Sequence, residues 1–237
     1  WNMDWIRGEQ AIKKIQIEVQ KQDNLKAYRL IYGYTFQLSA EMAILQENYM
    51  EGHHLLEEAR KILSGSQSRY EFFLKKWQAI CDLLRDPKSQ EKIQALRRIK
   101  SEAITLSDWE TRRDCEFYEA HAFGDDISFL KVYHGTPYPS YRARIKAIYK
   151  PRFSIPKNTV WKIGPESNDQ LNDRVFNMRD GCEHNGKVSL AGQPLLLKLL
   201  KILTSDYYRP VALGSLVSEL YPNEYFNPLT SPQKAYQ

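Results

Sequence analysis

The sequence predicts a mainly α-helical protein of two parts. A helical-repeat-like domain, built as a solenoid or bundle, is expected over 1–150, and a smaller α+β domain with a small antiparallel sheet is expected over 151–237. Three observations predict this fold class. Up to about residue 149 the apolar residues recur at helical spacing, with glycine and proline mostly at the breaks. After Pro151 short β-prone runs alternate with Gly, Asn and Asp clusters, and strong helical periodicity then returns.

The N-terminal part is expected to be helical throughout. Its spacing is clearest in two apolar groups: Ile6, Ile12, Ile15 and Val19, and Leu30, Tyr34, Phe36 and Leu38. Breaks between helices are expected at 22–24, 64–68, 85–89, 106–108 and 135–139. Asp86-Pro87 and Ser107-Asp108 are expected helix starts, and Gly124-Asp125-Asp126 is expected to end one helix and cap the next. Segments of this length are typical of helices stacked as antiparallel pairs.

Strands are expected at the start of the C-terminal part. The β-prone runs are Thr159–Ile163 and Arg174–Met178. A hairpin is expected in which Val175–Arg179 pairs with Lys187–Leu190 across a turn containing Asp180-Gly181.

Helices are expected to follow these strands. Pro194 is well placed as a first helical residue, and a second helix is expected over 213–220 after Arg209-Pro210-Val211. The first helix has an apolar face that is expected to be buried, made by Leu195, Leu196, Leu199, Leu200, Ile202 and Leu203.

Composition excludes several classes of protein. The 42% hydrophobic and 12% aromatic residues argue against intrinsic disorder, and 34 basic against 29 acidic side chains is only a mild positive excess. Three widely spaced cysteines predict neither a disulfide framework nor a zinc ribbon, and they favour a reducing cytoplasm. No run is apolar enough to span a bilayer, and the start lacks the pattern of a signal peptide, so no membrane partner is expected.

The C-terminal part resembles the winged-helix DNA-binding domain of the OmpR/PhoB response-regulator class. The pattern V-x-L-x-G-x-P-L-L-L-K-L-L-K-I-L at Val188–Leu203 matches that family's strand, turn and first helix. Arg209-Pro210-Val211 matches the connector, and L-G-S-L-V-S-E-L-Y at Leu213–Tyr221 matches the second helix. The resemblance covers about 80 residues and implies a third, DNA-reading helix that the sequence cuts off near its start. No receiver domain precedes it, which puts control by aspartyl phosphorylation in doubt.

This resemblance implies the DNA contacts. Ser231 is a good N-cap and Pro232 a good first residue for the third helix, whose exposed N–H groups suit phosphate. The loop 222–230 would contact RNA polymerase or a neighbouring protomer, as in the family. The expected DNA-binding residues are Thr230, Ser231, Gln233, Lys234, Tyr236 and Gln237, the last two for base reading.

The helical part resembles tetratricopeptide-type solenoids more weakly. The small and large core positions of one such repeat are matched by Phe36, Ala40, Ala43, Gly52, Leu56 and Ala59. Small residues at these positions let two helices approach closely. A domain of this kind would offer a surface for a regulatory protein or peptide, or for self-association.

Other residue clusters carry competing interpretations. Cys115, Glu119 and His121 do not share one helix face, so no catalytic residue is expected. Neither His53-His54 nor Cys182-Glu183-His184 has the spacing of a metal site, and no phosphate loop is present, so no metal or cofactor is expected.

Two basic groups leave alternatives open. Arg97, Arg98, Lys100, Arg112 and Arg113 either supplement DNA binding or form a solvated face paired with Glu91, Glu102 and Glu110. Tyr138, Tyr141, Arg142 and Arg144 combine aromatic and basic side chains at the domain junction, which suits DNA binding or the docking of the two domains.

The function predicted from the sequence is a DNA-binding transcription regulator without enzymatic activity, which binds double-stranded DNA and has a helical sensing domain. Homodimerisation is expected from how such readers usually gain specificity. The alternative is a helical-repeat adaptor whose winged helix mediates protein contacts only.

Overall fold

The computed structural model describes residues 5–22, 25–65, 68–149, 160–163, 174–177, 190 and 192–223. The chain divides into two compact units. The first consists of residues 1–129 and 139–151, and the second consists of residues 130–138 and 152–237. Each unit is described by itself.

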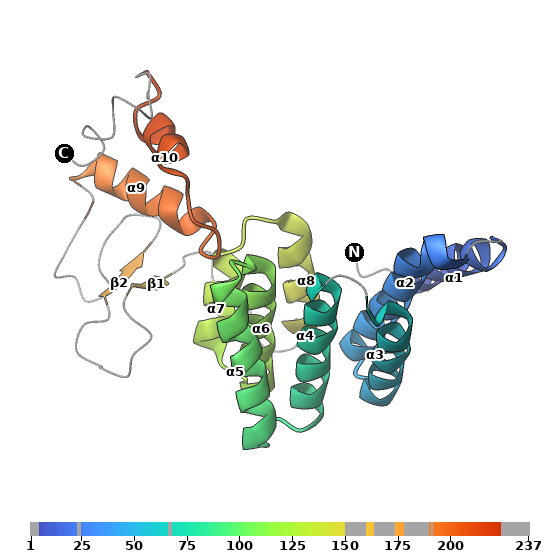
Figure 1. The fold of residues 1–237 in the computed structure, drawn as a ribbon. Helices are drawn as coiled ribbons and strands as arrows, with labels where there is room; N and C mark the ends of the chain where they lie inside the picture. Colours follow the sequence, from blue (N-terminus) through green and yellow to red (C-terminus); the bar gives the residue numbers. More distant parts are fainter. Residues whose placement is uncertain are drawn as a thin grey trace. The chain divides into compact units, whose positions relative to one another are not determined.

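The first unit is built from antiparallel helices joined by short connections (Figure 1). The helices are α1 (Trp5–Gln20), α2 (Leu25–Leu45), α3 (Tyr49–Leu63), α4 (Ser68–Arg85), α5 (Gln90–Thr105), α6 (Trp109–Phe123), the start of α7 (Asp126–His134), and α8 (Pro139–Tyr149). From α1 to α6 each helix packs against the next one, and α4 also packs against α2 and α6. The even-numbered helices α2, α4 and α6 are therefore neighbours in one layer, and this layer carries the candidate site.

Local sequence signals fix several helix ends. Asn48, Ser89 and Asp108 cap α3, α5 and α6 by accepting a hydrogen bond from the backbone N–H three residues later. Gly124 ends α6 in the left-handed conformation at φ 64°, which glycine adopts without strain. The expected start at Ser107-Asp108 is thus confirmed, whereas the start expected at Asp86-Pro87 is wrong because Ser89 is the cap.

One helix break was not expected. Residues 46–48 separate α2 from α3, and Glu47 lies in the left-handed region at φ 62°. The turn is closed by a hydrogen bond from the Asn48 N–H to the Ala43 carbonyl at 2.8 Å. Asn48, the cap of α3, is the local sequence signal for this break, although the left-handed Glu47 is not a glycine.

Helices α2 and α3 approach each other closely. A Cβ placed on Gly52 would lie 2.7 Å from Ile44 Cγ1, and one on Gly33 would lie 2.5 Å from the Leu63 side chain. Ala40, Leu56 and Ala59 of the expected repeat-like pattern are completely buried here. Small residues therefore permit the tight packing of this pair.

The core of the first unit is apolar and aromatic. Its fully buried side chains include Leu56, Leu63, Leu74, Trp77, Ile80, Leu83, Leu96, Phe117, Tyr118 and Phe129. Of the first predicted apolar group, Ile12 and Val19 are buried, but Ile6 and Ile15 are exposed. Half of that predicted helix face therefore does not contribute to this core.

The second unit contains α9 (Pro194–Ser205) and α10 (Leu213–Leu220), which contact each other. Pro194 is in the first turn of α9, as expected. Residues 130–138 belong to this unit: the Tyr207 N–H donates to the Gly135 carbonyl at 2.9 Å, and Lys131 Nζ lies 4.6 Å from the centre of the Tyr207 ring.

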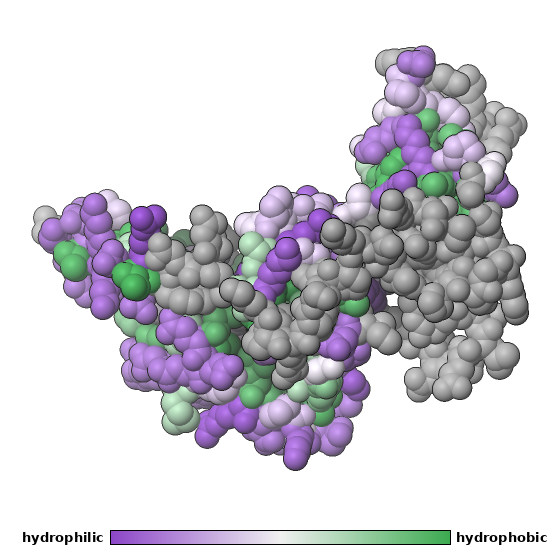
Figure 2. All heavy atoms as spheres, turned by 180° about the vertical axis from the view of Figure 1, so that it is seen from behind, coloured by the Kyte–Doolittle hydropathy of each residue, from purple (hydrophilic) through white to green (hydrophobic). Residues whose placement is uncertain are grey.

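The apolar face of α9 is not buried as expected. Ile202 is 7% exposed, but Leu195, Leu196 and Leu203 are 44–47% exposed. No described residue of α10 is buried either. Figure 2 shows apolar atoms on the surface of this helix pair, at the upper right. The periodicity of α9 identified the helix but not what covers it.

Strands β1 (Val160–Ile163) and β2 (Arg174–Asn177) pair antiparallel, with Val160 opposite Asn177 and Ile163 opposite Arg174. The hairpin expected between Val175–Arg179 and Lys187–Leu190 falls largely outside the described residues. The pairing of β1 with β2 is confined to these four-residue strands, and the main contacts of α9 and α10 are with each other.

The predicted fold class is therefore wrong. A helical-repeat-like domain joined to an α+β winged helix with a small antiparallel sheet requires leucine helices packed on a sheet. The described residues support a helical, bundle-like fold instead, in which the α9 leucines have no such layer beneath them.

Candidate functional site

The expected DNA-binding residues Thr230, Ser231, Gln233, Lys234, Tyr236 and Gln237 lie outside the described residues. The metal-site alternative Cys182-Glu183-His184 does so as well. The candidate site that the structure does present lies in the first unit.

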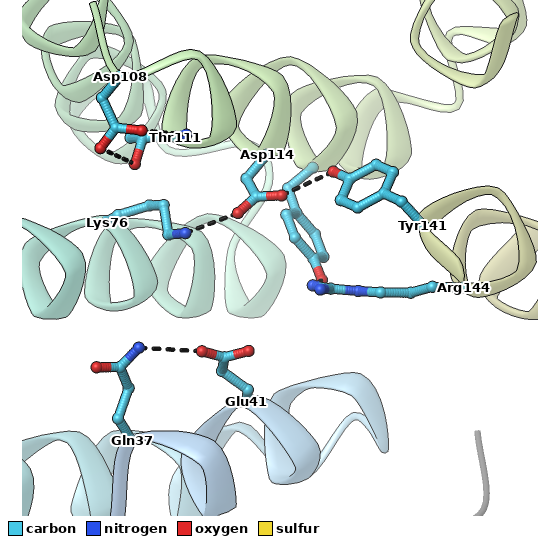
Figure 3. A network of polar contacts seen from close by, with 9 residues as sticks. Gln37, Glu41, Lys76, Asp108, Thr111, Asp114, Tyr141 and Arg144 are labelled. Carbon is cyan, nitrogen blue, oxygen red and sulfur yellow. Dashed lines mark hydrogen bonds and ion pairs between the residues drawn. The ribbon is translucent and has the colours of Figure 1, made fainter. Parts of the chain in front are cut away.

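Four helices of the first unit bring polar and aromatic side chains together (Figure 3). We call this set the polar network. Its members are Gln37 and Glu41 on α2, Lys76 and Trp77 on α4, Asp114 and Tyr118 on α6, and Tyr141 and Arg144 on α8. Gln37 and Glu41, and likewise Asp114 and Tyr118, are four positions apart, and Tyr141 and Arg144 are three apart, so each of these pairs lies on one helix face, whereas Lys76 and Trp77 are adjacent in the sequence.

Asp114 is the centre of the polar network. Lys76 Nζ donates to its Oδ2 at 2.6 Å, and the Tyr141 hydroxyl donates to its Oδ1 at 2.7 Å. Figure 3 shows these two side chains reaching Asp114 from different helices. Lys76 and Asp114 are 5% and 6% exposed, so this is a buried ion pair with both carboxylate oxygens hydrogen-bonded.

Mutual attraction governs the protonation of this pair. Burial alone would raise the pKa of Asp114, but the nearby Lys76 and Arg144 charges hold it below its ordinary value. Burial alone would lower the pKa of Lys76, but the carboxylates of Asp114 and Glu41 raise it above its ordinary value. Both groups are therefore charged at neutral pH.

Arg144 connects α8 to α6 and α4. Its Nη2 donates to the Tyr118 hydroxyl at 2.6 Å, and its guanidinium lies 5.4 Å from the centre of the Trp77 ring. Burial raises the pKa of Tyr118 to about 12, so this phenol stays neutral. The Nε of Arg144 is buried and has no hydrogen-bond partner among the described residues.

Of the two carboxylates in the polar network, Glu41 has fewer hydrogen-bond donors than Asp114. Gln37 Nε2 donates to Glu41 Oε1 at 3.1 Å, and no ion pair within 4.0 Å joins Glu41 to another described residue. Burial raises the pKa of Glu41, although the charges of Arg144 and Lys76 act in the opposite direction. Gln37, itself 3% exposed, has an Oε1 without a partner among the described residues.

Three aromatic residues and one arginine lie next to the polar network, between α2 and α4, where the side chains are more exposed. Tyr34 and Tyr70 pack edge to face at 5.9 Å between ring centres. Arg69 lies 5.4 Å from the centre of the Phe73 ring, and Lys76 lies 5.2 Å from the same ring. We call Tyr34, Arg69, Tyr70 and Phe73 the α2–α4 edge. Arg69 is exposed, Tyr34 is 37% exposed, and the other two are half-buried.

Neither Asp114 nor the neighbouring Cys115 is placed as a nucleophile. Asp114 is held by two donors, and Cys115 next to it is completely buried. Burial raises the pKa of the Cys115 thiol, which disfavours the reactive thiolate. Glu119 pairs with Arg97 at 2.7 Å and His121 stacks on Phe117, so these contacts do not join them to Cys115.

The basic group on α5 and α6 is largely paired with acidic side chains. Arg97 and Lys100 both pair with Glu119, at 2.7 and 3.6 Å, and Arg112 pairs with Glu116 at 3.2 Å. The solvated-face interpretation expected ion pairs here, but to Glu91, Glu102 and Glu110. The partners come from α6 because α5 and α6 pack against each other.

Sequence reasoning found only part of the polar network. Tyr141 and Arg144 were singled out as DNA-binding or domain-docking residues, but their contacts are with α4 and α6 of their own unit. Glu41, Lys76 and Asp114 were missed. The available signal was a charged residue at a position where the helix face is otherwise apolar, as for Lys76 beside buried Trp77 and Ile80.

Among the described residues no group of His, Cys, Asp and Glu could hold a metal ion. No helix in that part of the chain is long and apolar enough to cross a membrane.

No protein-family model, curated protein or solved structure matches the chain. The resemblances to winged-helix and tetratricopeptide proteins therefore stay predictions from the sequence.

Proposed function

We propose that the chain is a helical adaptor whose first unit binds a protein partner at the α2–α4 edge. The single observation that carries this proposal is the chemistry of that edge. Exposed Arg69 and partly open Tyr34 lie beside a buried, mutually paired set of charges. Arginine and tyrosine are enriched where proteins bind proteins, because both offer large contact area and hydrogen-bond donors.

The buried part of the network supports the proposal by holding the edge rigid. Lys76 is tied to Asp114 by its ammonium group and lies over the Phe73 ring, so α4 is anchored directly behind the exposed residues. A partner meeting a preorganised surface loses less conformational entropy on binding.

Site-specific photo-crosslinking tests this proposal. A photoreactive amino acid replaces exposed Glu71, next to Tyr70 of the edge, in one variant, and replaces exposed Arg98 on α5 in a matched control, so Arg69 itself is retained. We expect a discrete adduct from position 71 and none from position 98 in cells that make the protein. The cross-linked partner, purified, should bind the wild type and the Arg98→Gln variant but not the Arg69→Glu variant. Equal adducts from both positions, or binding that Arg69→Glu leaves unchanged, would refute the proposal.

Binding of double-stranded DNA through 230–237, and regulation of transcription by it, stays a prediction from the sequence alone. A cytoplasmic location is also proposed. It is supported by Cys81 and Cys115, which are both free and buried.

A further inference from the structure

Glu41 lies at the interface between two groups of helices in the first unit. Helices α2 and α3 form one group, held together by the close packing around Gly52. Helices α4, α6 and α8 form the other group, which the hydrogen bonds of Asp114 and Arg144 join. Figure 3 shows Gln37 and Glu41 pointing from α2 toward this second group. The two groups meet where α2 and α3 pack against α4.

The connection between the two groups permits movement. After α3 the chain passes through Gly65, which has a φ of 74°. No described group lies within 4 Å of the place where a Cβ on Gly65 would be, so packing does not hold this turn. A glycine in such a position can absorb a change in backbone angles. Across the interface Cys81 on α4 donates to the Tyr49 carbonyl on α3 at 3.4 Å, and a thiol is a weak donor.

The closed interface leaves buried polar atoms without hydrogen bonds. Gln37 Oε1 and Arg144 Nε are both buried and have no partner among the described residues. Glu41 accepts a hydrogen bond from Gln37 of its own helix, and no ion pair within 4.0 Å joins it to a described residue of the second group. A buried polar atom without a partner raises the free energy of the closed form, whereas water satisfies it in an open form. The polar atoms of this interface therefore favour opening.

The charge of Glu41 affects this balance further. The charged groups that act on it are Arg144 on α8, Lys76 on α4 and Asp114 on α6. Both cations are already bonded, to Tyr118 and to Asp114, so burial has the larger effect and raises the pKa of Glu41 above its ordinary value of 4.5. Helices α1 and α3 also pack against α2, and their ion pairs are formed within each helix: Glu18–Lys21, Glu57–Arg60 and Glu58–Lys61, with His54 acting on Glu58.

From these observations we infer that Glu41 is a pH-sensitive switch that controls the opening of α2 and α3 from α4. The closed form accommodates the protonated carboxyl, whereas loss of the proton leaves an ionised carboxylate in a buried site. The contribution of Glu41 to closing is therefore complete below the pKa of the open form, and it is lost as pH rises through the higher pKa of the closed form. The α2–α4 edge lies across the same interface, because Tyr34 of α2 meets Tyr70 of α4. The inference does not require a partner to bind at that edge.

Labelling of two buried cysteines by a small thiol reagent tests the inference. Cys81 is 1% exposed and contacts α3, so opening of the interface makes it reactive. Cys115 on α6 is completely buried, and α6 packs against α4 and α5, so it reports opening elsewhere in the unit. Each wild-type rate is divided by the rate for Glu41→Gln at the same pH, which cancels the effect of pH on the thiol itself. Mass spectrometry identifies the labelled cysteine.

The ratio of rates should depend on pH at one cysteine only. For Cys81 we expect it to increase at least about fivefold between about pH 5 and pH 8, because each unit by which a pKa is raised can change the opening equilibrium about tenfold. The ratio for Cys115 should stay constant. Glu58→Gln, which breaks an exposed ion pair on α3, should label like the wild type at every pH. Circular dichroism should show that both variants keep the wild-type helix content.

Three results would overturn the inference. The first is a ratio for Cys81 that does not change with pH. The second is a wild type in which Cys81 stays unlabelled up to about pH 8 while the urea-unfolded protein is labelled completely. The third is a parallel increase at Cys115, which would assign the opening to unfolding of the whole unit.

Discussion

Removing the Asp114 carboxylate should destabilise the first unit strongly. In Asp114→Ala the buried Lys76 ammonium loses its counter-charge, and breaking a buried ion pair in this way costs about 3–5 kcal/mol. The Tyr141 hydroxyl also loses a charged acceptor, a loss of about 1.5–3 kcal/mol that overlaps in part with the first. We expect a total near 4 kcal/mol, a large fraction of the roughly 5–15 kcal/mol that stabilises a typical domain.

Urea unfolding followed by circular dichroism at helical wavelengths measures this loss. The double variant Lys76→Met, Asp114→Leu replaces the pair by apolar side chains and should recover at least about 2 kcal/mol relative to Asp114→Ala. The matched control is Glu58→Gln, which breaks an exposed ion pair to Lys61 and should leave the unfolding midpoint unchanged. A loss below about 1 kcal/mol in Asp114→Ala would refute the assignment of a buried, mutually dependent pair.

Three further predictions follow from single features. Because burial raises the pKa of Glu41 in the folded state, its contribution to stability is present below the unfolded pKa and is lost as pH rises through the folded pKa. Glu41→Gln should therefore be more stable than the wild type at neutral pH by about 1 kcal/mol, and urea midpoints from acidic to neutral pH should show the gap opening; a gap that widens toward acid would contradict this. Gly52→Ala should cost about 1–3 kcal/mol in thermal or urea unfolding, because its Cβ would lie 2.7 Å from Ile44, and an unchanged midpoint would show that the helix pair is looser than described. If Lys234 contacts phosphate, binding to random-sequence duplex DNA should weaken as salt rises, and Lys234→Gln should reduce the salt slope by about 1; binding indifferent to salt would remove the DNA prediction.

The sequence predicted most of the helices of the first unit but not how they meet. Asp108 and Gly124 mark helix ends through local hydrogen bonds and backbone preference, which neighbouring residues reveal. The break at 46–48 was not predicted although Asn48 caps α3 in the same way, because Glu47 makes the left-handed turn before it without a glycine.

The contacts between helices that are distant in the sequence were predicted less well than the helices themselves. Lys76 and Asp114 are 38 residues apart, and helical periodicity says which face a residue occupies but not which helix faces it. The same limit explains the error at α9, where Leu195 and Leu203 repeat as core residues do and yet stay exposed. Turn signals such as Asp180-Gly181 are also local. They favoured a sheet-based domain, but they carry no information on how the helices and strands of such a domain pack.

The ion pair between Lys76 on α4 and Asp114 on α6 favours one alignment of these two helices over others. Two helices that pack through apolar side chains alone can slip past each other by a turn and still bury similar side chains. Lys76 and Asp114 meet in a single alignment, and any slipped alignment would strand both charges in an apolar interior. We expect the apolar replacement of the pair to keep the helices folded while allowing alternative alignments, which would broaden the methyl resonances of the surrounding leucines.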